Sequence, residues 1–237
     1  MTAESSPEPV AIRPAATVVL QRRNGGRNEV LMMRRNANAV FVGGHYVFPG
    51  GAVDDHDYVV ATDASLFAHV EIRAPKMTGN GPDADAATSD VVEHAAYVVA
   101  AVREAFEEAG LLLARRPDNS WVDLFDAETK KRFALYRDEL NSGAATFADI
   151  LSAEGLHIES GDLTYWSRWI TPIGPPRRFD ARFFVAETPF NHEATPDNAE
   201  LVHAEWVAPA DALRRFDAGD FPIIFPTIKT LQSMPHH

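Results

Sequence analysis

The chain has 237 residues, of which 46% are hydrophobic and 24% charged, which is the composition of a globular protein able to bury a substantial core. Its formal net charge of −12 argues against nucleic-acid or anionic-membrane partners, and its lack of cysteine excludes disulfides, thiolate zinc sites and a cysteine nucleophile. The longest apolar runs fall far short of the roughly 20 residues that cross a bilayer, so we expect a cytoplasmic protein with no membrane partner.

The N-terminal half contains a predicted hairpin followed by an irregular segment. Residues 1–13 are acidic and contain proline, so we expect a disordered lead-in there and a single domain over 14–237. "AATVVLQRR" and "EVLMMRR" predict two strands joined at an Asn-Gly turn, and "HYVFPGGAV" predicts a strand that ends in a proline-glycine break. Residues 55–90 are rich in turn formers and lack periodicity, which indicates an insertion that "YVVATDASLFAHVEIRA" orders in part.

The C-terminal half predicts helices and strands that together suggest an α/β layer architecture, a mixed sheet with helices on its faces. A helix is expected from about Asp90 to Ala109, with Gly110 as its C-terminal cap and "LLLAR" as a buried strand after it. Further helices are expected at "DAETKKRFALYRDELNSG", "TFADILSAEG", "PADALRRFDAG" and "FPTIKTLQSM", and strands at "TYWSRWITP", "DARFFVAETP" and "AELVHAEWVAP". The order of the strands does not follow from these patterns.

Three glutamates crowd one side of the predicted helix in "REAFEEAG". At about 100° per residue, Glu107 falls near −60° and Glu108 near +40° relative to Glu104, so all three project together. One interpretation is a solvated acidic surface, because like charges one turn apart cost only a few tenths of a kcal/mol. The other is a magnesium or manganese site, because hard oxygen ligands converge from one face. The core-facing stripe on the opposite side consists of Val102, Ala105, Phe106 and Ala109.

A proline-glycine turn upstream completes a recognisable pattern with this helix. "FPGG" ends at Gly51 and permits close backbone approach, although most such turns are only turns. Together the two pieces resemble the Nudix box, with Gly51 as its opening glycine and Asp57 where that family has glutamate. The spacing departs from the family by an insertion of about 38 residues, placed at about 58–92. The helix supplies Arg103, Glu104, Glu107, Glu108, Gly110 and Leu111.

A split box of this kind resembles one branch, the Nudix-type motif 19 coenzyme A diphosphatases. "GHYVFPGG", "RWITPIGPPRRFDARFFVA" and "EWVAPADAL" also look like that branch, and the resemblance runs from about Pro14 to Leu231. It implies a Nudix-type α/β/α sandwich around a mixed sheet. It also implies metal-dependent hydrolysis of the diphosphate bond of coenzyme A or acyl-coenzyme A, giving 3′,5′-ADP and (acyl-)4′-phosphopantetheine.

The resemblance assigns roles to individual residues. Glu104, Glu107 and Glu108 would hold Mg²⁺ or Mn²⁺, with Glu104 and Glu108 also catalytic, and Arg103 would orient them, although a plain ion pair would leave the same trace. The general base is expected to be Glu104, with Glu193 and Glu200 as alternatives on later loops. Asp57 is expected to reach the metal only through water, if at all. Substrate-binding candidates are Gly51, Arg34 beside Arg35, Arg177, Arg178 and Arg182.

Three other functions stay open at this point. The first is a Nudix hydrolase of ADP-ribose, NADH or a nucleotide sugar, because the box is the same for all. The second is a nucleotide-binding regulator without turnover, although such modules usually lose a box glutamate and this chain keeps all three. The third is a purely structural acidic domain. The expected partner is a small nucleoside diphosphate derivative, and a homodimer is compatible with the sequence.

Overall fold

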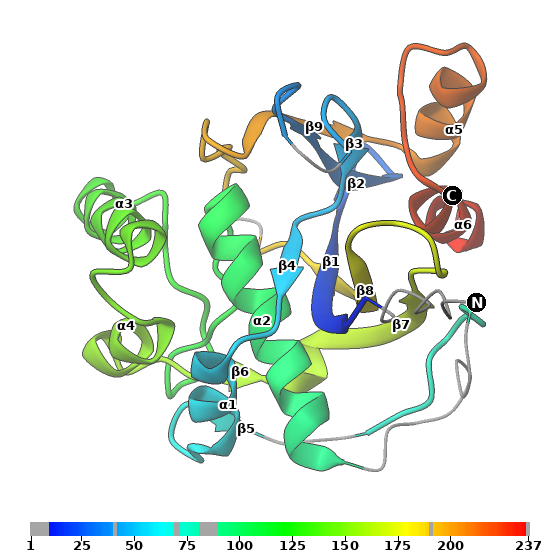
Figure 1. Ribbon diagram of the computed structural model, residues 1–237. Coiled ribbons are helices and arrows are strands. Elements are labelled where there is room, and N and C mark those ends of the chain that lie inside the picture. Colours follow the sequence, from blue (N-terminus) through cyan, green and yellow to red (C-terminus); the bar gives the residue numbers. More distant parts are fainter. Residues whose placement is uncertain (1–9, 40–41, 69–71, 81–89, 190–191, 236–237) are drawn as a thin grey trace, which may run out of the picture.

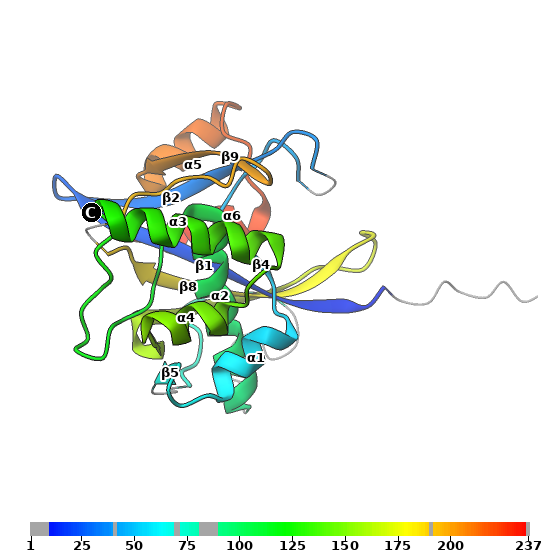
Figure 2. The ribbon, with the colours of Figure 1, turned by 90° about the vertical axis from the view of Figure 1, so that its left-hand side faces the viewer.

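One mixed sheet of seven strands organises the computed structural model, which describes residues 10–39, 42–68, 72–80, 90–189 and 192–235. Helices cover both faces of this sheet, and a separate pair of short strands lies near its edge (Figures 1 and 2). This arrangement is the α/β/α sandwich predicted from the sequence. In chain order the elements are β1 (Ile12–Asn24), β2 (Arg27–Arg35), β3 (Tyr46–Val47), β4 (Gly50–Ala52), α1 (Asp55–Thr62), β5 (Phe67–Ala68), α2 (Val91–Ala109), α3 (Ala127–Ser142), α4 (Phe147–Glu154), β6 (Ile158–Glu159), a 3₁₀ turn (Ser160–Asp162), β7 (Leu163–Ile170), β8 (Arg178–Glu187), β9 (Leu201–Val207), α5 (Pro209–Asp217) and α6 (Phe225–Ser233).

The central strand β1 has one edge divided between two partners. Its other edge pairs in parallel with β8 from Ile12 to Gln21. On the divided edge, β4 pairs with Ala15–Thr17 and β2 pairs with Gln21–Asn24, both antiparallel. The hairpin of β1 and β2 predicted from "NGGRN" is therefore confirmed. β4 and β2 thus pair with different parts of the same edge of β1. The glycines of β4 lie directly against helix α2.

Alternating side chains of the central strands enter two separate cores. Val18 and Leu20 of β1 pack under α2, whereas Val19 between them packs on the opposite face. In β2, Leu31 joins the first core and Met32 the second. The first core also receives side chains of α3 and α4, and the second receives those of α5 and α6. Burial on both faces explains why these strands are nearly continuous apolar runs.

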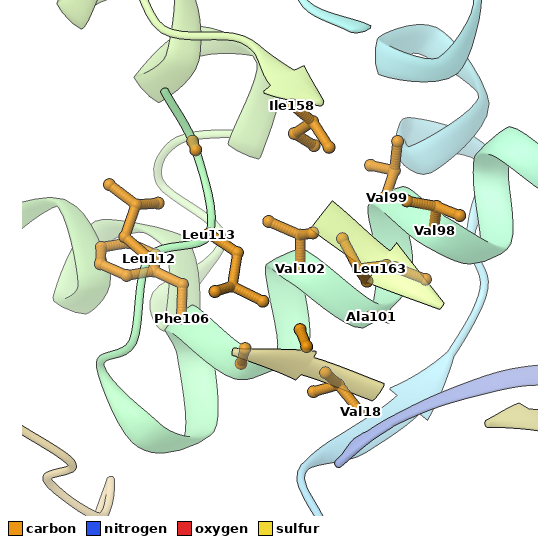
Figure 3. Close-up of a cluster of buried hydrophobic side chains, with 14 of the residues drawn as sticks. Val18, Val98, Val99, Ala101, Val102, Phe106, Leu112, Leu113, Ile158 and Leu163 are labelled. Carbon is orange, nitrogen blue, oxygen red and sulfur yellow. The ribbon is translucent and has the colours of Figure 1, made fainter. Parts of the chain in front are cut away.

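Helix α2 is the central helix of the first core, and its bounds agree with the prediction. The Asp90 side chain accepts a hydrogen bond from Glu93 N at the start, and Gly110 ends the helix at a left-handed φ of 67°. Figure 3 shows Val102 and Phe106 of α2 among the buried side chains of this core, with Phe106 beside Leu112. The predicted apolar stripe is confirmed, because its four residues Val102, Ala105, Phe106 and Ala109 are all buried.

Two predicted features differ from the structure. The run "LLLAR" after Gly110 is buried but is not a strand, since within it only Arg115 forms isolated bridges, to Trp121 and His157. A short apolar run is compatible with a strand or with buried irregular chain, so its composition does not decide between them. Strand β1 begins at Ile12, inside the predicted lead-in, while residues 1–9 lie outside the described residues.

The predicted insertion begins within an ordered helix. Helix α1 carries Asp54 as its N-cap and packs against α2 with Val60 fully buried. Strand β5 then pairs in parallel with β6, while residues 69–71 and 81–89 of the predicted insertion lie outside the described residues. Within the described part of the chain, helices are all too short or too polar to span a membrane.

Candidate active site

Arg103 stands at the centre of a buried network of carboxylates. Its Nε and Nη2 donate to the two carboxylate oxygens of Asp57 at 2.8 and 3.0 Å. Its Nη1 donates to Glu104 Oε1 at 2.8 Å and to Glu107 Oε2 at 3.0 Å, and Nη2 also reaches the carbonyl oxygen of Ala52 at 2.8 Å. One guanidinium therefore connects β4, α1 and the glutamates of α2. The predicted orienting role of Arg103 agrees with this geometry.

Asp57 has a different role from the one expected of it. Its carboxylate is 1% exposed and forms a two-point ion pair with Arg103 from 46 positions along the chain. It also accepts a hydrogen bond from Asp54 N, which completes the capping box of α1. Both Asp57 oxygens accept hydrogen bonds from Arg103, and the expected contact to metal through water, if there is one, stays a prediction. The chain after Asp57 leaves and returns, so the two halves of the divided motif meet in space.

The glycines of β4 make room for the glutamates of α2. Gly50 N donates to Glu108 Oε2 at 2.8 Å. A Cβ placed on Gly51 would lie 2.3 Å from Glu104 Oε1, so a larger residue would displace that carboxylate. A Cβ on Gly50 would lie 2.4 Å from the Ala16 carbonyl oxygen, so the strand pairing also requires glycine there. "PGG" is thus a close approach of backbone to catalytic candidates, and not merely a turn.

The glutamates are not a solvated acidic surface. Glu104 is 8% exposed and Glu108 is 6% exposed. Burial raises the pKa of Glu104 to about 7, and burial together with the neighbouring Glu104 charge raises the pKa of Glu108 well above its ordinary value. Burial also raises the pKa of Glu107. The carboxylates of this cluster therefore resist ionisation despite the positive charge of Arg103.

The donor chemistry at this position fits a hard divalent cation. Mg²⁺ and Mn²⁺ favour carboxylate oxygen, and the raised pKa values show where added positive charge would be most favourable. In their present positions, however, no three His, Asp or Glu side chains of the described residues converge as a metal site. Arg103 holds one oxygen each of Glu104 and Glu107. The metal site predicted from Glu104, Glu107 and Glu108 therefore stays a prediction.

Of the two arginines at the end of β2, Arg35 is the one that acts on the carboxylates. Its positive charge lowers the pKa of Glu108, although burial keeps that pKa high overall. Arg35 forms an ion pair with Glu200, and its Nε is buried without a partner among the described residues. Arg34 instead donates to the Gly44 carbonyl oxygen and lies over the ring of Tyr46, which belongs to the second core. The expectation that Arg34 binds substrate stays a prediction, and Arg35 is the member of the pair whose charge acts on Glu108.

The three arginines of "PPRRFDAR" are not gathered around the glutamates. Arg182 is 3% exposed, pairs with Glu93 at 2.7 Å and lies 3.8 Å from the ring centre of Tyr97. Its guanidinium is held inside the fold, and its Nε and Nη1 have no hydrogen-bond partner among the described residues, so the expectation that Arg182 binds substrate stays a prediction. Arg177 is exposed, and Arg178 donates to the Thr171 carbonyl oxygen at 3.1 Å. About 13 Å of extended strand separates Arg178 from the level of Arg182.

The two alternative general bases lie on the loop before β9. Glu200 is engaged by Arg35, as described above. Glu193 is exposed and forms a 3.4 Å ion pair with Lys130 of α3. Glu104 is the candidate that is buried and whose charge acts on Glu108. Its pKa of about 7 suits a base that works near neutral pH.

Sequence reasoning missed two charged residues beside the glutamates. Asp197 raises the pKa of Glu108 and accepts hydrogen bonds from the backbone of Ala199 and Leu201. Arg137 of α3 donates through Nε to the Glu107 carbonyl oxygen at 2.8 Å, and its Nη2 is buried without a partner among the described residues. Neither residue belongs to the motif. The sequence signal for Arg137 is weak, since it is one cation on a helix with mixed charges.

We expect the metal-free protein to lose stability as the pH rises from about 4.5 to about 7. Burial raises the pKa of Glu104 across this window, so the folded state retains a proton that the unfolded state releases. The stabilising contribution is complete below the unfolded pKa and is lost as pH rises through the folded pKa. Urea denaturation in EDTA between pH 5 and 8 should show a smaller decline for Glu104→Gln than for the wild type. Equal declines would contradict this assignment.

Comparisons with known proteins agree with the geometry. A family model described as NUDT19 Nudix domain matches residues 12–234. The acyl-coenzyme A diphosphatase NUDT19 of Homo sapiens is 31% identical over 209 residues, covering 79% of this chain and 55% of that protein. The Xenopus laevis protein of the same name is 24% identical over 249 residues, covering 95% of this chain and 64% of that protein. The chain therefore spans less than two thirds of the length of these curated relatives.

A solved structure supports the fold over nearly the whole chain. The crystal structure of a NUDIX hydrolase from Alicyclobacillus acidocaldarius has a TM-score of 0.73 at 31% sequence identity. The match covers 94% of this chain and 91% of that one. The divided arrangement of α1 and α2 thus lies within a fold that this neighbour shares.

Proposed function

The chain belongs to the Nudix hydrolases, in the family described as NUDT19 Nudix domain, and from this we propose that it hydrolyses the diphosphate bond of coenzyme A or its acyl thioesters. The expected products are 3′,5′-ADP and 4′-phosphopantetheine or its acylated form. The observation that carries the hydrolytic part is the buried network in which Arg103 joins Asp57 to Glu104 and Glu107. The substrate part is supported by the relatives that are named acyl-coenzyme A diphosphatase.

Different residues of the proposed site would bind the cation and position its ligands. Glu104, Glu107 and Glu108 would hold Mg²⁺ or Mn²⁺ at the edge of β4. When bound, the cation supplies positive charge that neutralises diphosphate oxygens and assists the attack of water. Arg103 positions Glu104 and Glu107 through its two Nη1 hydrogen bonds, and Gly50 N positions Glu108. Arg35 carries positive charge toward the same place, and its buried Nε has no hydrogen-bond partner among the described residues.

Glu104 is proposed as the general base. In the metal-free protein, burial raises the pKa of Glu104, which makes this carboxylate a stronger proton acceptor than an exposed glutamate. Its contact with Arg103 fixes one oxygen and leaves the other available. Glu193 and Glu200 are less suited, because each is paired with a cation, Glu193 with Lys130 and Glu200 with Arg35.

The substrate is tested by a direct comparison. Wild-type protein is incubated with coenzyme A, an acyl-coenzyme A, ADP-ribose, NADH and a nucleotide sugar, first with Mg²⁺ and then with Mn²⁺, and the products are separated by chromatography. Cleavage of coenzyme A or its thioester to 3′,5′-ADP supports the proposal. Brisk cleavage of ADP-ribose or NADH with coenzyme A untouched would overturn it in favour of another Nudix substrate. Tight binding of a nucleotide without any turnover would indicate a regulator.

Arg177→Ala and Arg178→Ala are expected to raise KM for coenzyme A more than for dephospho-coenzyme A. Only the former carries a 3′-phosphate, which lies on the ribose away from the scissile bond. Arg178 begins β8 and Arg177 directly precedes it, about four residues along the chain from the level of Arg182. A charge-assisted phosphate contact is worth about 1.5–3 kcal/mol, which is about tenfold or more in KM. Arg27→Ala, an exposed arginine at the start of β2, is the control. Equal changes for both substrates would remove the two arginines from the proposed site.

A further inference from the structure

The chain between β5 and α2 passes around one edge of the main sheet. β7 is the outermost strand on that side, since it pairs with β8 and with no other strand of the described residues. Figure 1 shows residues 72–80 on the side of the sheet that lies away from α3 and α4. β5 and α2 pack in the first core, whereas Met77 between them packs against the second. The chain therefore crosses from one face of the sheet to the other and back.

Residues 76–80, which we call the edge cover, form hydrogen bonds along the outer edge of β7. The amide of Lys76 donates to the carbonyl oxygen of Tyr165 at 3.2 Å. The amide of Met77 donates to the carbonyl oxygen of Trp166 at 2.8 Å. Backbone carbonyls at the edge of a sheet are normally open to another strand, and here residues of the same chain occupy them.

Asn80 and Gly79 continue the edge cover toward the end of β7. The Asn80 side chain donates through Nδ2 to the Ile170 carbonyl oxygen at 3.0 Å, and its Oδ1 accepts from the Ile170 amide at 2.6 Å. These two bonds replace those that an added antiparallel strand would form with the same residue. Asn80 N also donates to the carbonyl oxygen of Arg168 at 3.0 Å. Gly79 permits this approach, because a Cβ there would collide with the Arg168 carbonyl oxygen.

Without the edge cover, β7 would present an edge well suited to strand pairing. Its sequence, LTYWSRWI, is rich in aromatic and β-branched residues, and its single charge, on Arg168, is paired with Asp180 at 2.6 Å. Every residue of β7 is buried or half-buried, so its two faces are already covered. A bulge at Trp166 interrupts the pairing with β8, but residues 167–170 beyond it pair regularly. A regular, uncharged edge is a template for another chain.

We propose that the edge cover is an intramolecular competitor of self-association, and that β7 without it pairs with β7 of a second copy of the chain. A second copy is the matching partner, because two identical edges can pair antiparallel about a twofold axis and need no other complementary surface. The insertion that divides the motif would thus keep the molecules apart. This role is separate from catalysis and does not depend on the substrate proposed above.

Hydrogen exchange and mass together test the edge cover in the full-length protein. Gly79→Val should displace it, and Thr78→Val, at the exposed neighbouring position, is the matched control. In dilute solution we expect the Ile170 amide of Gly79→Val to exchange at least about tenfold faster than that of the wild type. In concentrated solution this amide should regain protection, while light scattering gives about twice the wild-type mass. Wild type and Thr78→Val should show slow exchange and an unchanged mass at both concentrations.

The milder variant Asn80→Ala removes only the side-chain bonds to Ile170, so it provides the same measurement if Gly79→Val does not fold. Fast exchange of the Ile170 amide at both concentrations, with the wild-type mass, would overturn the proposal by showing an open edge that does not associate. A doubled mass without renewed protection would place the contact elsewhere and would also overturn it. Wild-type protection of this amide in both variants would show that residues 76–80 do not cover the edge.

Discussion

Replacing Glu108 with glutamine is expected to lower kcat on a confirmed substrate by about 100- to 1,000-fold, which corresponds to about 2.7–4 kcal/mol of lost transition-state stabilisation. Glutamine keeps the shape of the side chain and can still accept the hydrogen bond from Gly50 N, so the backbone at β4 should stay in place. The change removes the negative charge that a divalent cation needs. KM should change little by comparison, because the loss falls on the chemical step.

The fold of this variant offers an independent measurement. Burial and the charge of Glu104 raise the pKa of Glu108, so removing its charge should leave the metal-free protein at least as stable as the wild type. Added Mg²⁺ should raise Tm of the wild type and have little effect on Glu108→Gln, since a ligand that binds the folded state stabilises it. The exposed Glu128→Gln on α3 is the matched control for kcat and Tm. Near-wild-type turnover by both Glu108→Gln and Glu104→Gln would contradict the mechanism.

The elements of this fold could be predicted where local chemistry determines them. Helix α2 has a side-chain cap at Asp90 and a left-handed Gly110, and both are visible in the sequence. The hairpin follows from its Asn-Gly turn in the same way. The prediction of a strand after Gly110 was wrong. The leucines of that segment are buried in the first core, and within the described residues they do not pair with another strand. Burial of that segment is set by distant helices, and no local residue reports them.

The site was predictable in its residue types but not in its surroundings. The helical periodicity placed Glu104, Glu107 and Glu108 on one side, as the structure has them. It also described that side as an outer face, whereas β4 covers it and buries two of the three glutamates. The pairing of β4 with β1 is a contact between segments far apart in the chain, so the local pattern contains no sign of it.

The arginines illustrate the same limit. Arg34 and Arg35 are adjacent in the sequence, and the pairing of β2 with β9 shifts register between them. At this irregularity the two side chains reach different surroundings: Arg34 lies over the ring of Tyr46, and the charge of Arg35 acts on Glu108. Arg182 lies in a basic cluster that suggests a phosphate site, yet its alternation with Phe184 directs it into the first core. Charge clustering alone was therefore a poor guide to which arginines lie near the glutamates.

Replacing Asp57 with asparagine is expected to lower the free energy of unfolding by about 3 kcal/mol, the lower end of the range for breaking a buried ion pair. Asp57 and Arg103 share two hydrogen bonds at 2.8 and 3.0 Å, and the amide would present a donor to one of the guanidinium donors. Burial raises the pKa of Asp57 despite that pairing, so forming the pair is itself costly. Removing the Asp57 charge is nevertheless destabilising, because it leaves the Arg103 guanidinium buried with one partner fewer. The loss of stability is limited, because Arg103 still pairs with Glu104 and Glu107.

Comparing the free energy of unfolding with kcat distinguishes whether Asp57 acts through Arg103 or contacts the reacting groups directly. Urea denaturation of Asp57→Asn should show the loss, while Asp55→Asn, an exposed first-turn residue of α1, should stay within about 0.5 kcal/mol of the wild type. In the folded protein, kcat of Asp57→Asn should fall less than that of Glu108→Gln, because Asp57 acts on the glutamates only through Arg103. Unchanged stability would mean that the two halves of the divided motif do not meet in solution. A loss of kcat as large as that of Glu108→Gln, without a loss of stability, would mean that Asp57 contacts the reacting groups directly.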